Sequence, residues 1–119
     1  MQPSGAPMRD FAVVEQTTEV PVSQVHAWLM RKDILLVDVR ETNEFEAEHI
    51  NGAVLLPFSR FDADAFPALS GTRIVMHCAV GKRSEAARKM LAKAGHAGVL
   101  NMTGGLTAWK AAGYETETE

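Results

Sequence analysis

Short apolar runs of strand length alternate with helical patterns along most of this chain. The clearest run is Ile34–Val39, which is apolar apart from Asp38 and therefore predicts a strand covered on both faces. Further strands are predicted at residues 52–57, 73–77 and 99–102. Alternating strands and helices are typical of an α/β domain, so we predict a mostly parallel central sheet flanked by helices on both faces.

Apolar spacing and capping residues predict the helices between these strands. Thr42 is a plausible N-terminal cap for a short helix, and Gly95 is a good C-terminal cap for a strong one. A weaker pattern follows the proline that ends the second strand. The helices are expected at residues 22–29, 42–45, 60–69, 83–94 and 106–112.

The chain has 119 residues, which fits a single domain. Residues 1–12 are rich in Pro, Gly and Ser and predict a flexible tail, so the domain is expected over 13–119. The short acidic end, 115–119, is expected to fray. There is no signal-peptide pattern and no apolar stretch of about 20 residues, so we expect a cytoplasmic protein that does not enter a membrane.

Charge and cysteine content exclude several function classes. The net charge of -3 argues against general nucleic-acid binding, which needs a basic surface. Cys78 is the only cysteine, so an internal disulfide and a C-x-x-C redox or zinc motif are impossible. The histidines at 26, 77 and 96 show no metal-ligand spacing with it. We therefore expect neither a metal nor another cofactor.

Cys78 directly follows a predicted buried strand and opens a tight loop before a helix. In α/β folds, chemistry gathers outside the carboxyl ends of the strands. Loop N–H groups and the helix N-terminus would favour an anion there, and Gly81 permits the turn. Lys82 and Arg83 add positive charge. The pattern predicts a nucleophilic cysteine with a lowered pKa, in a cradle that also accepts an anionic substrate.

Other interpretations of this region stay open. A lone cysteine is often a small buried hydrophobe. The neighbouring His77 should face away from Cys78, because adjacent strand residues point to opposite faces, so a Cys–His dyad is not expected. The basic residues that follow on the helix either extend the anion site or form an ordinary solvated face: Arg88, Lys89 and Lys93.

Four ordered motifs carry a family resemblance: Asp38-Val39-Arg40, Glu44-Phe45 with His49-Ile50-Asn51-Gly52-Ala53, the loop Cys78–Ser84, and Gly104-Gly105-Leu106 before Trp109. From about residue 20 to 114 the chain resembles the single-domain members of the rhodanese family. The resemblance implies a sulfurtransferase that takes a sulfane sulfur from thiosulfate or a similar donor. Cys78 would carry it as a persulfide to cyanide or a thiol. Loop residues would bind the substrate: Ala79, Val80, Gly81, Lys82, Arg83 and Ser84.

Charged and imidazole groups elsewhere allow two interpretations each. Asp38 and Arg40 either form a pocket wall or a structural ion pair, with Glu44 a further partner, because buried charges persist only when paired. Arg60 is a candidate for the pocket rim. His49 either contacts substrate or is a hydrogen-bonded structural residue. Glu48 and Asn51 depart from the family pattern, which puts local loop shape in question, not the chemistry.

Two other functions compete. A cysteine phosphatase or arsenate reductase also uses a thiolate in a loop before a helix, but the phosphatase signature has arginine six positions after the cysteine, and Arg83 is five positions after Cys78. A sulfur-carrier or regulatory module without turnover is the second alternative. The expected partners are a small anionic sulfur donor and a thiol, cyanide or protein acceptor; the sequence predicts no oligomeric state.

Overall fold

A computed structural model describes residues 17–118 of the chain. Its centre is a five-stranded sheet in the order β1-β5-β4-β2-β3, in which every neighbouring pair runs parallel. The strands are β1 (Glu19–Val20), β2 (Ile34–Asp38), β3 (Val54–Leu55), β4 (Arg73–His77) and β5 (Leu100–Met102). The predicted α/β class with a parallel sheet is confirmed. The tail predicted at 1–12 lies outside the described residues.

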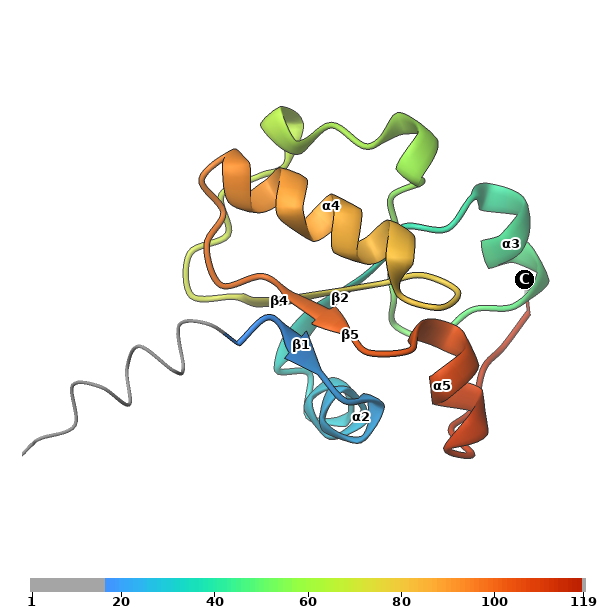
Figure 1. The fold of residues 1–119 in the computed structure, drawn as a ribbon. Helices are drawn as coiled ribbons and strands as arrows, with labels where there is room; N and C mark the ends of the chain where they lie inside the picture. Colours follow the sequence, from blue (N-terminus) through green and yellow to red (C-terminus); the bar gives the residue numbers. More distant parts are fainter. Residues whose placement is uncertain (1–16, 119) are drawn as a thin grey trace, which may run out of the picture.

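Helices cover both faces of the sheet (Figure 1). Helix α4 lies on one face, against β4 and β5, whereas α2 and α5 pack together on the other. The bounds are α2 (Val22–Met30), α3 (Thr42–Ala47), α4 (Lys82–Lys93) and α5 (Gly105–Ala111), with short 3-10 helices η1 (Phe58–Arg60) and η2 (Ala63–Ala65).

Two predicted helical details are wrong. Residues 60–69 form no α-helix; η1 and η2 stand there, and Asp62 caps η2 by accepting a hydrogen bond from the amide of Asp64. Helix α3 is not capped by Thr42. Glu41 is its N-cap and forms a capping box with Glu44, whose carboxylate accepts the Glu41 amide at 2.8 Å.

The apolar residues of the strands divide between two cores, one on each face of the sheet. Leu36 and Val75 point to the face of α2 and α5, whereas Val37 and Met76 point to the face of α4. This two-sided burial explains why the strands read as continuous apolar runs and not as alternating ones.

The end of the chain is paired, so the prediction that 115–119 frays is wrong for the described part. Glu117 and His49 exchange backbone hydrogen bonds of 2.8 Å, and the indole of Trp109 donates to the carbonyl of Glu115 at 2.9 Å. The segment lies beside α3 (Figure 1). Glu48, which departs from the family pattern, accepts hydrogen bonds from Lys110 and Thr116 and so helps to hold this end.

No helix within residues 17–118 is long and apolar enough to cross a membrane. The same residues contain no group of three or more His, Cys, Asp or Glu placed to hold a metal ion.

Candidate active site

Strand β4 delivers Cys78 to a loop beyond the carboxyl end of the sheet. The chain turns through Gly81, whose φ of 104° is in the left-handed region, and α4 begins at Lys82. Cys78 is only 1% exposed, so its thiol lies inside the loop and not on its rim. We call residues 78–84 the Cys78 loop.

Hydrogen-bond donors surround the Cys78 sulfur. The amide of Gly81 is 3.1 Å from Sγ, the amide of Ser84 is 3.4 Å away, and the Ser84 hydroxyl donates at 3.3 Å. The amide of Val80 further lowers the pKa of the thiol. The two amides that bond the sulfur, of Gly81 and Ser84, lie at the start of a helix or in the turn before it, which is an arrangement that binds anions.

These donors decide the ionisation of Cys78. Burial is the largest single influence and raises the pKa of the thiol, but the hydrogen bonds from Ser84, Gly81 and Val80 together outweigh it. The pKa of Cys78 is therefore below that of an ordinary cysteine, because the donors favour the thiolate. The Ser84 hydroxyl is a contributor that the sequence pattern, with its backbone amides and cationic side chains, does not single out.

Arg83 is held by an ion pair beside the Cys78 loop. Its guanidinium donates to both carboxylate oxygens of Glu44, at 2.8 and 3.1 Å, across 39 residues of sequence. This contact lowers the pKa of Glu44 to about 2, so the pair stays ionised throughout the neutral range. Much of the charge of Arg83 is thereby balanced, and the cysteine is stabilised mainly by the neutral donors of the loop.

Asp38 and Arg40 form a buried ion pair behind the site. The Asp38 carboxylate accepts hydrogen bonds from the Arg40 amide at 2.9 Å and from its guanidinium at 2.8 and 3.1 Å. Arg40 also donates to the backbone carbonyl of Glu48 at 2.6 Å. The suggested ion pair between Arg40 and Glu44 is wrong. The Glu44 carboxylate pairs with Arg83, and only the backbone carbonyl of Glu44 accepts a hydrogen bond from Arg40.

Neither neighbouring histidine is arranged as a base for Cys78. The ring of His77 has Nδ1 at 3.2 Å from the Cys78 carbonyl and Nε2 at 3.5 Å from an Asp38 carboxylate oxygen. Burial lowers the pKa of His77, which favours the neutral ring. The ring nitrogens of His49 contact the Phe45 carbonyl at 2.7 Å and the Glu117 carboxylate at 3.2 Å.

Arg60 borders a cavity of about 270 Å³ that includes no residue of the Cys78 loop; its other walls are Leu56, Pro57, Phe61, Asp62, Ala65, Phe66 and Pro67. Two hollows do adjoin the loop. One of about 410 Å³ includes Val80, Gly81 and Lys82, and one of about 200 Å³ includes Ala79.

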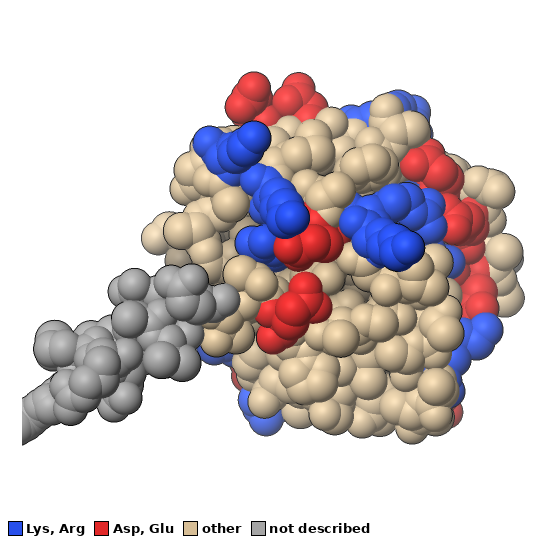
Figure 2. All heavy atoms as spheres, viewed as in Figure 1, with Lys and Arg blue, Asp and Glu red and all other residues tan. Residues whose placement is uncertain are grey.

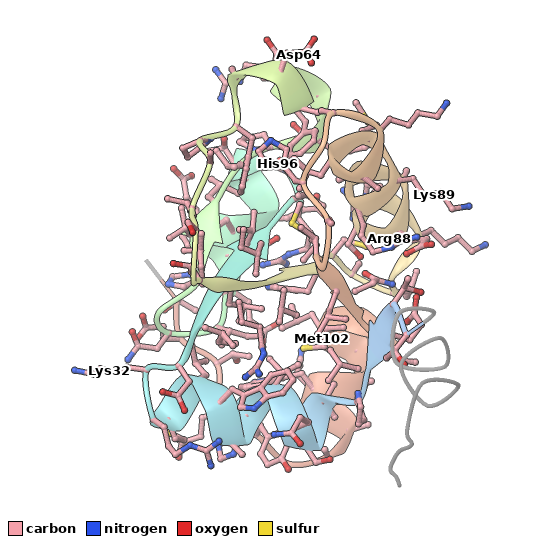
Figure 3. All side chains as sticks on the ribbon, turned by 90° about the vertical axis from the view of Figure 1, so that its left-hand side faces the viewer. Lys32, Asp64, Arg88, Lys89, His96 and Met102 are labelled. Atoms are coloured by element: carbon pink, nitrogen blue, oxygen red, sulfur yellow. The ribbon has the colours of Figure 1, made fainter. Side chains whose placement is uncertain are left out.

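The other basic residues considered for the anion site, Arg88, Lys89 and Lys93, belong to α4. Figure 2 shows basic side chains over this helix with acidic side chains between them, and Figure 3 shows Arg88 and Lys89 projecting outward from it. Arg88 pairs with Glu85 at 2.7 and 2.8 Å, and Lys89 and Lys93 are exposed. This arrangement favours the solvated helix face over an extension of the anion site.

We expect Ser84→Ala to raise the pKa of Cys78, because it removes a hydrogen bond that stabilises the thiolate. The rate of iodoacetamide alkylation against pH should inflect below the free-thiol value of about 8.5 in the wild type, and at higher pH in the variant. A lowered folded-state pKa stabilises the fold above the pKa of the unfolded thiol, and this contribution disappears as pH falls through the folded-state pKa. Ser59→Ala is the control, since Ser59 bonds Glu41. Identical inflections in all three proteins would contradict the assignment.

Comparison with known proteins places this site in a family. The family model "Rhodanese-like domain" matches residues 21–112. The chain belongs to the rhodanese-like domain family. The match includes the Cys78 loop and the Asp38–Arg40 pair, and it ends within the turn that follows α5.

Several known proteins are similar to this chain over most of its length. The uncharacterized protein slr1261 of Synechocystis sp. is 43% identical over 83 residues, covering 70% of this chain and 46% of that protein. The putative sulfur carrier protein YrkF of Bacillus subtilis is 29% identical, covering 80% and 54%. Thiosulfate sulfurtransferase GlpE of Pseudoalteromonas translucida is also 29% identical, covering 84% and 94%. The chain thus spans about half the length of the first two relatives.

A solved structure confirms the fold. The crystal structure of the BH2092 protein of Bacillus halodurans superposes with a TM-score of 0.76 at 21% identity, covering 93% of this chain and 84% of that one. The arrangement of sheet and helices is therefore shared with that solved structure.

Proposed function

We propose that this rhodanese-like domain is a sulfurtransferase that carries a sulfane sulfur on Cys78. The observation that carries the proposal is the ring of donors around Sγ, which stabilises a thiolate without a neighbouring base. A thiolate is the nucleophilic form of cysteine. The relative named thiosulfate sulfurtransferase supports thiosulfate as the first donor to test.

The first half of the proposed reaction loads the cysteine. The Cys78 thiolate attacks the outer sulfur of thiosulfate, the Sγ–S bond forms, and the S–S bond of thiosulfate breaks. Sulfite leaves with the electron pair of that bond. No proton is transferred and no external oxidant is needed. The amides and the Ser84 hydroxyl, which stabilise the thiolate before attack, are placed to stabilise the anionic persulfide after it.

The second half discharges the persulfide. Cyanide or a thiolate attacks the outer sulfur, the Sγ–S bond breaks, and the thiolate of Cys78 is restored. Cys78 is the only cysteine of the chain, so no internal disulfide can release the sulfur. An external acceptor, either a small thiol or another protein, has to take it. A reducing compartment such as the cytoplasm suits such a lone reactive thiol.

A sulfur-carrier role is the second candidate, and the relative named putative sulfur carrier protein favours it. A carrier would load Cys78 by the same first step and deliver the sulfur to one protein, with little turnover on small acceptors. Phosphate transfer fits less well, because Arg83, the arginine of the loop, is engaged by Glu44.

The proposal is tested by intact-mass measurement and a thiocyanate assay on the same preparation. Thiosulfate should add the mass of one sulfur atom to the reduced protein, and cyanide should remove it while thiocyanate forms. Loading without turnover would favour the carrier. The isolated persulfide should keep its added sulfur when no acceptor is present. If neither thiosulfate nor a low-molecular-weight persulfide raises the mass of the protein, both the sulfurtransferase and the carrier role are refuted.

A further inference from the structure

The start of α5 is in direct contact with the Cys78 loop. The amide of Leu106 donates to the Cys78 carbonyl at 2.8 Å, and the amide of Thr107 donates to the Ala79 carbonyl at 3.0 Å. The first amides of a helix have no acceptor within the helix itself. Here these amides donate hydrogen bonds to the carbonyls of the first two residues of the Cys78 loop.

These contacts fix the direction of N–H groups on the opposite side of the loop. A peptide unit is planar and trans, so its carbonyl and its N–H point in opposite directions, and none of the described peptide bonds is cis. The Ala79 carbonyl and the Val80 N–H belong to one unit. Because the carbonyl points at α5, the N–H points away from α5, and this Val80 amide is one of the groups that lower the pKa of the Cys78 thiol.

Gly105 permits this close approach. A Cβ atom at this position would lie 2.5 Å from the Cys78 oxygen and 2.7 Å from both the carbonyl carbon and the oxygen of Ala79. All three are backbone atoms of the loop, so the movement of a side chain could not relieve the clash. Its φ of 59° also lies in the left-handed region.

We propose that the first turn of α5 positions the Cys78 loop, and that Gly105 is the residue that lets its amides orient the donors around Sγ. Gly105, Leu106 and Thr107 are positioning residues in this assignment, since the hydrogen bonds to the sulfur come from Gly81 and Ser84. The inference deepens the proposed sulfur transfer and rests on it for its functional meaning. Its structural part concerns the ionisation of a thiol and can be measured without any sulfur donor.

The test compares Gly105→Ala with Gly113→Ala. Gly113 follows the same helix at its other end and has a φ of 88°, and a Cβ atom there would meet no atom within 4 Å. Alanine at that position therefore brings similar backbone strain without touching the loop. In Gly105→Ala the alkylation inflection of Cys78 should move up towards about 8.5, and persulfide formation should slow about tenfold or more. In Gly113→Ala both should stay near wild type. A folded Gly105→Ala protein with an unchanged inflection overturns the proposal.

A second pair of variants covers the case in which Gly105→Ala does not fold. Thr107→Pro removes the amide that bonds the Ala79 carbonyl, in the first turn of a helix, where proline is best tolerated. Thr107→Ala keeps that amide and is its control. The inflection should rise only in the proline variant, and equal inflections would refute the assignment.

Amide hydrogen exchange in the wild type needs no variant. The Leu106 and Thr107 amides should exchange slowly, although first-turn amides ordinarily exchange fast, and fast exchange would overturn the proposal whatever the variants do. These readouts separate the two hypotheses. A lowered Cys78 inflection that depends on Gly105, in a protein that never accepts sulfur, would keep the positioning role and remove the sulfurtransferase function.

Discussion

Replacing Cys78 with serine should abolish both the sulfur-dependent mass increase and thiocyanate formation, with a loss of turnover on the order of a thousandfold or more. Serine keeps nearly the same shape and can still accept hydrogen bonds from Gly81 and Ser84. It does not ionise at neutral pH and cannot form a persulfide. The chain holds no other cysteine that could take over.

The serine variant should also keep its fold, which makes the loss interpretable. The buried position is already lined by polar donors, so a hydroxyl has partners there and leaves no unsatisfied group. Thermal unfolding monitored by circular dichroism provides the check. A folded Cys78→Ser protein that still converts thiosulfate and cyanide to thiocyanate would remove the central claim, because no other group in the loop can hold a sulfane sulfur.

The fold is largely readable from the sequence because its signals are local. The run Ile34–Val39 is apolar on both faces, and both faces are indeed covered, by separate cores. The lone cysteine at the end of 73–77 lies at the carboxyl edge of the sheet as predicted, because a parallel α/β topology brings all strand ends to that edge. Weak signals account for the errors. The pattern over 60–69 lacks a sustained helical period, and two 3-10 turns form instead.

Contacts between distant segments are not readable in the same way. The Arg83–Glu44 pair spans 39 residues, and nothing in either local pattern distinguishes it from a pair with Arg40. The end of the chain looks like a polar tail, yet Glu117 pairs with the backbone of His49. The acidic composition of this segment predicts that it is exposed to solvent. Whether its backbone forms hydrogen bonds with another segment depends on which turn lies beside it in the fold.

The contribution of α5 to the site illustrates the same limit. Gly104-Gly105 reads as a helix boundary, which it is, and no local pattern indicates that a side chain at the second glycine would collide with Cys78 and Ala79. The donors around the sulfur come from the Cys78 loop itself, whereas their orientation depends on a helix that begins only at Gly105, beyond α4 and β5. The residues that contact the Cys78 sulfur are therefore close together in the sequence, whereas the helix that orients them is distant from them in the sequence.

Inserting one glycine between Gly81 and Lys82 should depress sulfur transfer by about a hundredfold, comparable to the loss of a donor from an oxyanion site. Ser84 provides two of the contacts to Sγ, through its amide at 3.4 Å and its hydroxyl at 3.3 Å. An added residue lengthens the chain by up to about 3.6 Å, which is enough to withdraw both contacts. The alkylation inflection should rise together with the loss of transfer.

The insertion also tests whether loop length separates sulfur from phosphate chemistry. It moves the arginine to the sixth position after Cys78, as in the phosphatase signature. We expect negligible aryl phosphate hydrolysis in the wild type and at most a gain in phosphate or arsenate binding in the variant, because Glu44 holds Arg83. A glycine inserted after Gly71, in an exposed turn before β4, is the matched control and should leave sulfur transfer intact. Two results would show that loop length does not separate sulfur from phosphate chemistry: fast aryl phosphate hydrolysis by the wild type, or sulfur transfer by the loop-insertion variant as fast as by the control. A phosphatase function would then have to be considered again.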